Sequence, residues 1–197
     1  MRLLELFSGT GSVRKAVSHM FSEVVSIDIL PKFEATETID ILKWNYKKYP
    51  VGYFDAVWAS PPCTEYSKAK SIGIRNLTLA DTIVKKTIEI IEYFNPDKWF
   101  IENPQTGLLK DREMMWGLPY VDVDYCCYGF SYRKRTRIWT NVEYQGKLCN
   151  PTVCSQMKDG KHITSVGNGY KKYTNKSISK EEKYGIPNKL IQELFQS

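Results

Sequence analysis

The sequence lacks several features that would assign it to a class at once. Its 197 residues contain no apolar run as long as a membrane span, no internal repeat and no low-complexity tract. The opening MRLLELFSG has neither the long apolar stretch nor the cleavage site of a secretory signal. This length favours one domain with room for a small appendage. We therefore expect an intracellular protein with an ordinary globular core.

Cysteine is scarce, and its number is odd. The five are Cys63, Cys126, Cys127, Cys149 and Cys154. An odd number of cysteines in a chain without a secretory signal argues against a disulfide framework. A reactive thiol or a metal site is the better expectation.

Charge and aromatic content are compatible with a nucleic-acid partner. The formal net charge is +6, and 13 tyrosines are present. Positive charge suits a polyanion, and aromatic rings stack on bases. Because many basic proteins bind no nucleic acid, these features assign no function alone.

Hydrophobic patterning predicts an α/β fold. Residues 2–7 are typical of a buried strand, residues 12–21 have helical spacing, and residues 24–27 form a second strand that ends at Asp28. A strand, a glycine turn, a helix and a strand open a parallel α/β sheet. Further strands are expected at 54–59, 99–101, 120–126 and 136–139, with a helix at 79–94 and the last two strands as an antiparallel pair.

These elements predict a doubly wound, mostly parallel, Rossmann-like sheet. Residues 1–141 would form the core, and residues 142–178 an irregular segment rich in Lys, Asn, Gly, Cys and Tyr. Residues 179–197 begin with a capping-box pattern and would form a terminal helix that packs back on the core.

The first candidate site is the glycine turn after the opening strand. Gly9 and Gly11 would let a ligand approach the backbone, and Asp28 at the end of the next strand could bind ribose hydroxyls. This arrangement serves dinucleotides and S-adenosylmethionine alike. The dinucleotide fingerprint needs a third glycine, where this sequence has Arg14.

Two further motifs follow strand ends that should lie at the same edge of the sheet. Pro61 and Pro62 stiffen the exit of one strand and fix the backbone at Cys63. Glu102 and Asn103 end the next parallel strand, so the carboxylate would face the same crevice. If each motif is considered alone, Cys63 could equally be an ordinary loop cysteine, and Glu102 could be a surface acid.

A basic run occupies the last predicted strand. Alternation places Arg133, Arg135 and Arg137 on one face, where guanidinium groups suit phosphates and base carbonyls. Such runs are more often a solvated strand face.

The order of these four motifs over residues 2–141 resembles that of the C5-cytosine DNA methyltransferase family. The resemblance implies that Cys63 is the covalent nucleophile, that Glu102 contacts cytosine N3, and that Arg135 and Arg137 belong to the catalytic site. It further implies S-adenosylmethionine as the cofactor. The cofactor-binding positions would be Phe7, Gly9, Gly11, Asp28, Asp40, Ile41 and Pro61.

The sequence departs from the family pattern near its end. The family places a large target-recognition domain after the arginine motif, where only residues 142–178 are available here. A Gly-Asn pair at Gly167-Asn168 resembles the family's final motif but precedes the terminal helix. We therefore expect weak sequence selectivity.

The chemistry of the family explains why these residue types are needed. A thiolate adds to cytosine carbon 6 while an acid acts at N3, and this activates carbon 5. The thiol then needs nearby positive charge, for which the three arginines are candidates, and the acid should be partly desolvated. The target base cannot be reached inside a duplex, so it must be single-stranded or flipped out.

A Cys/His cluster is predicted in the irregular segment. Cys149, Cys154 and His162 are potential ligands of a structural zinc ion, and Cys126 or Cys127 could supply a fourth. Unconnected thiols are the alternative.

The predicted function is methylation of cytosine carbon 5 in DNA. The alternatives are the same chemistry on RNA or a free nucleotide, a silent nucleic-acid-binding module, and a dinucleotide-dependent oxidoreductase. The oxidoreductase leaves the Pro-Pro-Cys and Glu-Asn-Pro motifs unexplained.

Overall fold

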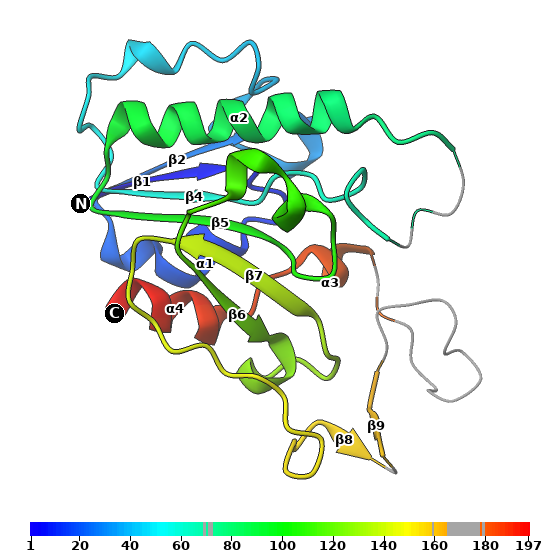
Figure 1. The fold of residues 1–197 in the computed structure, drawn as a ribbon. Helices are drawn as coiled ribbons and strands as arrows, with labels where there is room; N and C mark the ends of the chain where they lie inside the picture. Colours follow the sequence, from blue (N-terminus) through cyan, green and yellow to red (C-terminus); the bar gives the residue numbers. More distant parts are fainter. Residues whose placement is uncertain (69, 71–72, 159, 165–177, 179) are drawn as a thin grey trace.

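The fold is built on a seven-stranded sheet (Figure 1). The computed structural model describes residues 1–68, 70, 73–158, 160–164, 178 and 180–197. The strands are β1 (Arg2–Leu6), β2 (Glu23–Asp28), β3 (Glu37–Thr38), β4 (Ala56–Ala59), β5 (Lys98–Pro104), β6 (Tyr120–Asp124) and β7 (Arg135–Thr140). Their order is β3-β2-β1-β4-β5-β7-β6, in which the first five run parallel and β7 runs antiparallel to both of its neighbours. The predicted mostly parallel sheet and its antiparallel pair are confirmed.

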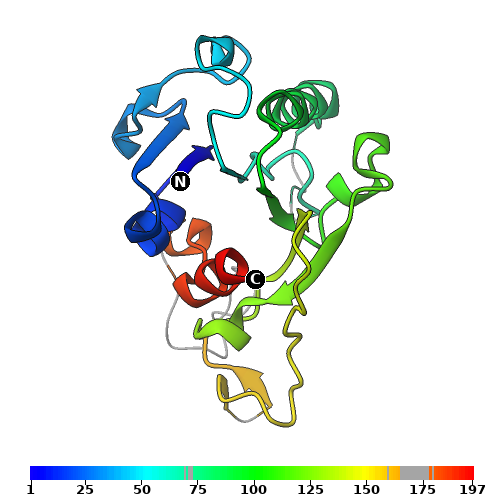
Figure 2. The same cartoon turned by 90° about the vertical axis from the view of Figure 1, so that its left-hand side faces the viewer.

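Helices cover both faces of this sheet. The α-helices are α1 (Ser12–Val17), α2 (Leu77–Phe94), α3 (Lys180–Tyr184) and α4 (Asn188–Gln196). Short 3-10 helices are η1 (Ser18–Met20), η2 (Pro31–Phe33), η3 (Tyr46–Lys48), η4 (Leu109–Asp111), η5 (Glu113–Met115) and η6 (Tyr125–Tyr128). Helix α2 lies on one face, while α1 and α4 lie together on the other (Figure 1). Figure 2 shows the same separation from another side, with blue α1 beside red α4 and green α2 apart from both. Among the described residues, no helix is both long enough and apolar enough to span a membrane.

Each face carries its own hydrophobic core. Under α2, buried residues of the helix such as Val84, Ile90 and Phe94 pack with alternate residues of the central strands. Under α1 and α4, the core includes Trp58, Phe100 and Phe195, whose rings lie 5.0–6.2 Å apart. Burial on both faces explains why the central strands read as continuous apolar runs.

Two helices differ from the sequence prediction. The helix expected over 12–21 ends at Val17 and continues as the 3-10 turn η1. The terminal helix is two helices, because Pro187 lacks an N–H group and precedes Asn188, where α4 begins. Ile186, expected on the helix, lies in the connection between them.

The sheet has a topological switch point between β1 and β4. From β1 the chain runs outward to β3, then returns to β4 and continues to β5 on the other side. Ligands of open α/β sheets bind in the crevice at the carboxyl ends of such strands. The glycine turn follows β1 and the Pro-Pro-Cys loop follows β4, so both meet at this crevice.

The chain after Asn141 runs along the outer edge of β6. The Asp124 N–H donates to the Lys147 carbonyl oxygen at 3.0 Å. A Cβ atom at Gly146 would collide with the carbonyl oxygen of Asp122, so only glycine permits this close approach. Further along lies a two-stranded ribbon of β8 (Met157–Lys158) and β9 (Lys161–His162).

Candidate functional site

A cavity of about 430 Å³ opens at the switch point. This size falls within the range of about 300–1,000 Å³ typical of small-molecule sites. The glycine turn, the end of β2, the Pro-Pro-Cys loop and the end of β5 line it. Tyr184 at the end of α3 and Ile186 in the connection to α4 complete the lining. Four of the segments singled out in the sequence therefore share one cavity.

The glycine turn is shaped by left-handed backbone and by Asp28. Phe7, Gly9 and Gly11 have φ values of 58°, 49° and 68°. One Asp28 carboxylate oxygen accepts from the Gly9 N–H at 2.8 Å and the other from the Leu30 N–H at 2.9 Å. The carboxylate thus ties the turn to the loop after β2, and both border the cavity.

Not every predicted cofactor position borders this cavity. Phe7, Gly9, Asp28 and Pro61 line it. Gly11 is the N-cap of α1, and Ile41 is 5% exposed in the core under α2. Asp40 accepts a hydrogen bond from the Leu42 N–H at 3.0 Å, which closes a local turn.

A second acid, Glu5, also lines the cavity. It is the last but one residue of β1 and is 2% exposed. One carboxyl oxygen accepts from the Val13 N–H at 3.3 Å, and the other has no hydrogen-bond partner among the described residues. Burial raises the pKa of Glu5 to about 7, against weaker lowering by α1 backbone N–H groups. The sequence prediction missed this residue, which sits two positions before Phe7.

The Pro-Pro-Cys loop is held in place from two sides. The side-chain amide of Asn103 donates to the Pro61 carbonyl oxygen at 2.9 Å and so ties the end of β5 to the end of β4. Beyond Cys63, the Tyr66 N–H donates to the Cys63 carbonyl oxygen at 3.1 Å, and buried Tyr66 donates to Asp81 of α2 at 2.9 Å. Backbone anchors therefore fix Cys63 at the cavity wall.

Glu102 lines the same cavity, and two side chains contact its carboxylate. The Tyr125 hydroxyl donates to Glu102 Oε1 at 3.0 Å, and Lys134 Nζ lies 3.5 Å from that oxygen. Glu102 is 6% exposed, which matches the expected desolvation. Burial raises the pKa of the Cys63 thiol, nearby Glu102 raises it further, and Lys134 lowers it.

The arginines predicted beside Cys63 lie on the other side of their strand. Arg137 makes a two-bond pair with Asp122, both bonds at 2.8 Å. Arg133 and Arg135 pair with Asp124 at 3.1 and 3.5 Å. Two lysines, Lys32 and Lys134, line the cavity, and Lys134 is the one beside Glu102. The alternation that puts the arginines on one face puts Lys134 on the opposite face with Glu102. This alternation in the sequence could therefore have indicated the orientation of Lys134.

Some lysine and tyrosine side chains of the segment after Asn141 make contacts within the protein. Lys147 pairs with Glu193 of α4 at 2.7 Å, and Tyr144 donates to the same carboxylate at 2.6 Å. Lys158 and Lys161 lie in the β8-β9 ribbon. Outside the described residues lie Gly167, Asn168, Gly169, Tyr170, Lys171, Lys172, Tyr173 and Lys176.

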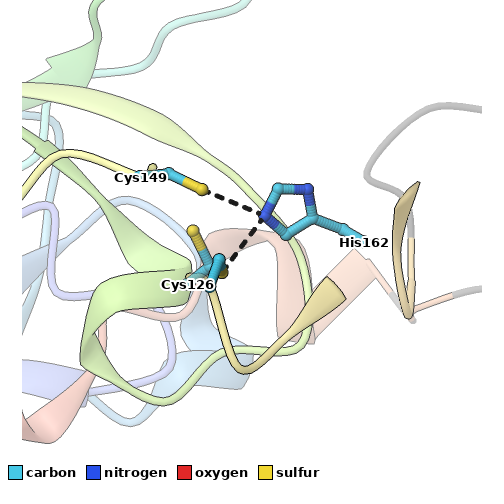
Figure 3. A group of neighbouring side chains, drawn as sticks. Cys126, Cys149 and His162 are labelled. Carbon is cyan, nitrogen blue, oxygen red and sulfur yellow. Dashed lines mark hydrogen bonds between the residues drawn. The ribbon is translucent and has the colours of Figure 1, made fainter. Parts of the chain in front are cut away.

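The predicted metal ligands do come together. Cys149, Cys154 and His162 meet Cys126, and the four potential ligand atoms all lie within 4.8 Å of one another. Figure 3 shows Cys126, Cys149 and His162 converging from different segments. Cys127, the other residue considered for the fourth position, packs beside the core under α1 and α4.

Known structures share the fold. A candidate DNA modification methyltransferase encoded in an Escherichia coli prophage matches with a TM-score of 0.55 and 13% identity, over 81% of this chain and 56% of that one. The Schizosaccharomyces pombe Dnmt2 methyltransferase matches with a TM-score of 0.52 and 17% identity, over 75% of this chain and 51% of that one. The chain thus spans about half the length of these two proteins.

Sequence comparison gives the family. A protein of Frog virus 3 (isolate Goorha), described as "Probable DNA (cytosine-5)-methyltransferase", is 34% identical over 99% of both chains. The family model for C-5 cytosine-specific DNA methylase matches residues 1–116, which include the glycine turn, the Pro-Pro-Cys loop and Glu102. With the motifs in one cavity and these matches, the chain belongs to the C-5 cytosine-specific DNA methylase family.

Proposed function

We propose that this protein transfers a methyl group from S-adenosylmethionine to carbon 5 of cytosine in DNA, through a covalent adduct on Cys63. The observation that carries the proposal is one cavity that contains both Cys63 and Glu102 and opens onto a glycine turn. A nucleophile, an acid and a cofactor site are the three parts that this reaction needs.

The chain's residues act on the pyrimidine ring. The Cys63 thiolate adds to carbon 6 while Glu102 hydrogen-bonds N3, so the electrons of the 5,6 double bond can shift toward carbon 5. Carbon 5, now part of an enamine, is the atom that receives the methyl group. Loss of the carbon-5 proton to a base then expels the thiolate and restores the double bond. Each step is easier than direct attack by the aromatic ring.

Glu102 also controls the ionisation of Cys63. Its negative charge raises the pKa of the thiol, and Lys134 opposes that effect. When Glu102 takes up a proton from solvent and shares it with cytosine N3, its charge next to the thiol is reduced and the thiolate becomes more stable. Binding of the correct base would therefore activate the nucleophile, and the resting enzyme would keep a less reactive thiol.

The acceptor groups along the other half of the cavity fit S-adenosylmethionine. Asp28 could accept from ribose hydroxyls, and the partnerless buried oxygen of Glu5 suits a donor group on a ligand. Phe7 and the Gly9 backbone would complete the cradle. When bound, this cofactor supplies an electrophilic methyl group on a sulfonium.

The substrate we propose is DNA with its target cytosine single-stranded or flipped out of the helix, because Cys63 lies inside a cavity. The formal charge of +6 favours binding to the phosphate backbone.

The test is incubation with labelled S-adenosylmethionine and matched DNA, RNA and nucleotide substrates, followed by nucleoside analysis. We expect labelled 5-methylcytosine from DNA. DNA that contains 5-fluorocytosine should trap an adduct on Cys63, since fluorine cannot leave as the proton does. Cys63→Ser should abolish both signals, and Cys127→Ser is the matched control that should keep both. Label in RNA or nucleotides alone, or an adduct on another cysteine, would refute the proposal.

A further inference from the structure

We propose that Cys126, Cys149, Cys154 and His162 bind one zinc ion, which fastens the segment after Asn141 to the sheet domain (Figure 3). Three cysteine sulfurs and one imidazole nitrogen are a donor set that zinc prefers, and four ligands without an open position are typical of a structural site.

The spacing of the ligand atoms fits a tetrahedral zinc ion. Zinc bonds of about 2.3 Å to sulfur and about 2.0–2.1 Å to nitrogen put neighbouring ligand atoms about 3.5–3.8 Å apart in a tetrahedron. His162 Nε2 lies 3.5 Å from the Cys149 sulfur and 3.7 Å from the Cys154 sulfur. All four atoms fall within 4.8 Å of one another, so small side-chain adjustments would complete the site.

The four ligands come from two parts of the chain. Cys126 lies in η6, directly after β6, and is 4% exposed. Cys149, Cys154 and His162 come from the segment after Asn141, and pairing of Met157 with His162 in the β8-β9 ribbon brings His162 back toward Cys154. A metal ion here would therefore join an irregular segment to the edge of the sheet.

This segment has little apolar packing to hold it. Val142 and Tyr144 at its start pack against the core, but three apolar side chains farther along are exposed: Leu148 at 56%, Val153 at 77% and Ile163 at 47%. A short segment without its own core gains most from a metal ion, because metal binding supplies the folding free energy that packing does not.

The surroundings also suit the charge of the site. A zinc ion with three thiolates and a neutral imidazole has a net charge of −1. Asp124 Oδ2 accepts from the Cys149 N–H at 2.9 Å, and Arg133 pairs with the other oxygen of Asp124 at 3.1 Å. Arg133 thus brings a positive charge to the ligand cluster, and Asp124 orients the loop that carries Cys149.

The ligand cluster adjoins both residues that contact Glu102. Cys126 follows Tyr125, and Arg133 precedes Lys134, while the Tyr125 N–H donates to the Lys134 carbonyl oxygen at 3.2 Å. The metal would therefore steady the two segments that hold Glu102. This part of the inference rests on the proposed function, whereas metal binding itself does not.

The test is the zinc content of purified, reduced protein by mass spectrometry. We expect about one zinc per chain, and in Cys154→Ser a fall of at least about tenfold in metal affinity. Cys127→Ser, which alters the neighbour of a ligand, should keep its zinc. His162→Cys supplies another zinc ligand and should also retain the metal.

A second measurement covers the case in which a variant does not fold. Cobalt replacing zinc in the wild-type chain should give the intense absorption of a tetrahedral thiolate site, and a chelator should hasten tryptic cleavage after Lys158. Wild-type protein without bound metal, a disulfide among the three cysteines, or equal metal loss from Cys127→Ser and Cys154→Ser would overturn the proposal. Because these readouts need no methyl transfer, failure of the proposed function would leave them unchanged.

Discussion

Glu102→Gln is the substitution that best distinguishes a catalytic role of Glu102 from a structural one. Glutamine keeps the size of the side chain and can still accept from the Tyr125 hydroxyl, which donates to Glu102 at 3.0 Å. It loses the charge and the exchangeable acid proton. We expect methyl transfer to fall about 10²–10⁴-fold, the usual effect of a positioned acid. That range corresponds to about 3–5 kcal/mol of transition-state stabilisation.

A merely structural Glu102 would give a smaller loss. Because glutamine still accepts from the Tyr125 hydroxyl, only the difference between a charged acceptor (about 1.5–3 kcal/mol) and a neutral one (about 0.5–1.5 kcal/mol) is lost, which is about tenfold. The assay is single-turnover methylation at saturating cofactor, with cofactor affinity measured separately. A loss below about tenfold would refute the assignment of Glu102 as the acid at N3.

Glu102→Gln should slow methyl transfer but make the Cys63 thiol easier to ionise. Since the Glu102 charge raises the pKa of Cys63, its removal should let iodoacetamide alkylate Cys63 at lower pH than in the wild type. Lys134→Met should shift alkylation to higher pH, because Lys134 lowers that pKa. Mass spectrometry of the Cys63 peptide gives both profiles, and buried Cys126 reports any general unfolding. Shifts of the same sign in both variants would contradict the electrostatic account.

Three further predictions concern other parts of the molecule. Glu5 has its pKa raised to about 7 from 4.5, so ionisation of the unfolded chain should destabilise the protein progressively as pH rises from about 4.5 to 7. Glu5→Gln should remove most of this pH dependence, which amounts to up to about 3 kcal/mol in the free energy of unfolding. The measurement is urea unfolding across pH without cofactor. If the free energy of unfolding changed with pH equally in the variant and the wild type, the pKa of Glu5 would not be raised. Phe195→Ala should destabilise by about 3–5 kcal/mol because Phe195 packs on Trp58 and Phe100, and exposed Gln196→Ala should change stability by less than about 0.5 kcal/mol. Finally, DNA binding should weaken steeply as the salt concentration rises. Methylation should show little sequence preference, since base readout requires a rigid element in a groove. Bisulfite sequencing that reveals a target site of about four or more fixed base pairs would contradict this.

Much of the fold could be predicted from periodicity. The strand before the glycine turn and the helix ending at Phe94 have patterns that tertiary packing reinforces, so both were found near their true bounds. The helix after Ser12 was overextended, because Met20 keeps the apolar spacing although the backbone tightens after Val17. Pro187 was a visible helix breaker whose effect the apolar pattern around it concealed.

The site was partly predictable for a different reason. Cys63 and Glu102 stand at strand ends, and the edge of a parallel sheet gathers strand ends whatever their separation in sequence. Alternation along the basic run indicates that Lys134 faces away from the arginines. No local pattern predicts the register of β5, β6 and β7, which brings Tyr125 and Lys134 to Glu102. The arginine run lies on the face of the sheet that also carries its partner acids, such as Asp122, and charge density along a strand does not reveal where such partners lie.

The backbone that covers β6 has a consequence for association. An uncovered edge strand offers unpaired N–H and C=O groups to other chains and promotes aggregation. At the opposite edge, β3 has only two residues and offers little to pair with. At the β6 edge, the chain around Gly146 and Lys147 covers the strand, and the proposed zinc ion lies just beyond it. Metal-depleted protein should therefore form oligomers through β6 before its sheet unfolds, and the first sign of zinc loss should be turbidity rather than a lower melting temperature.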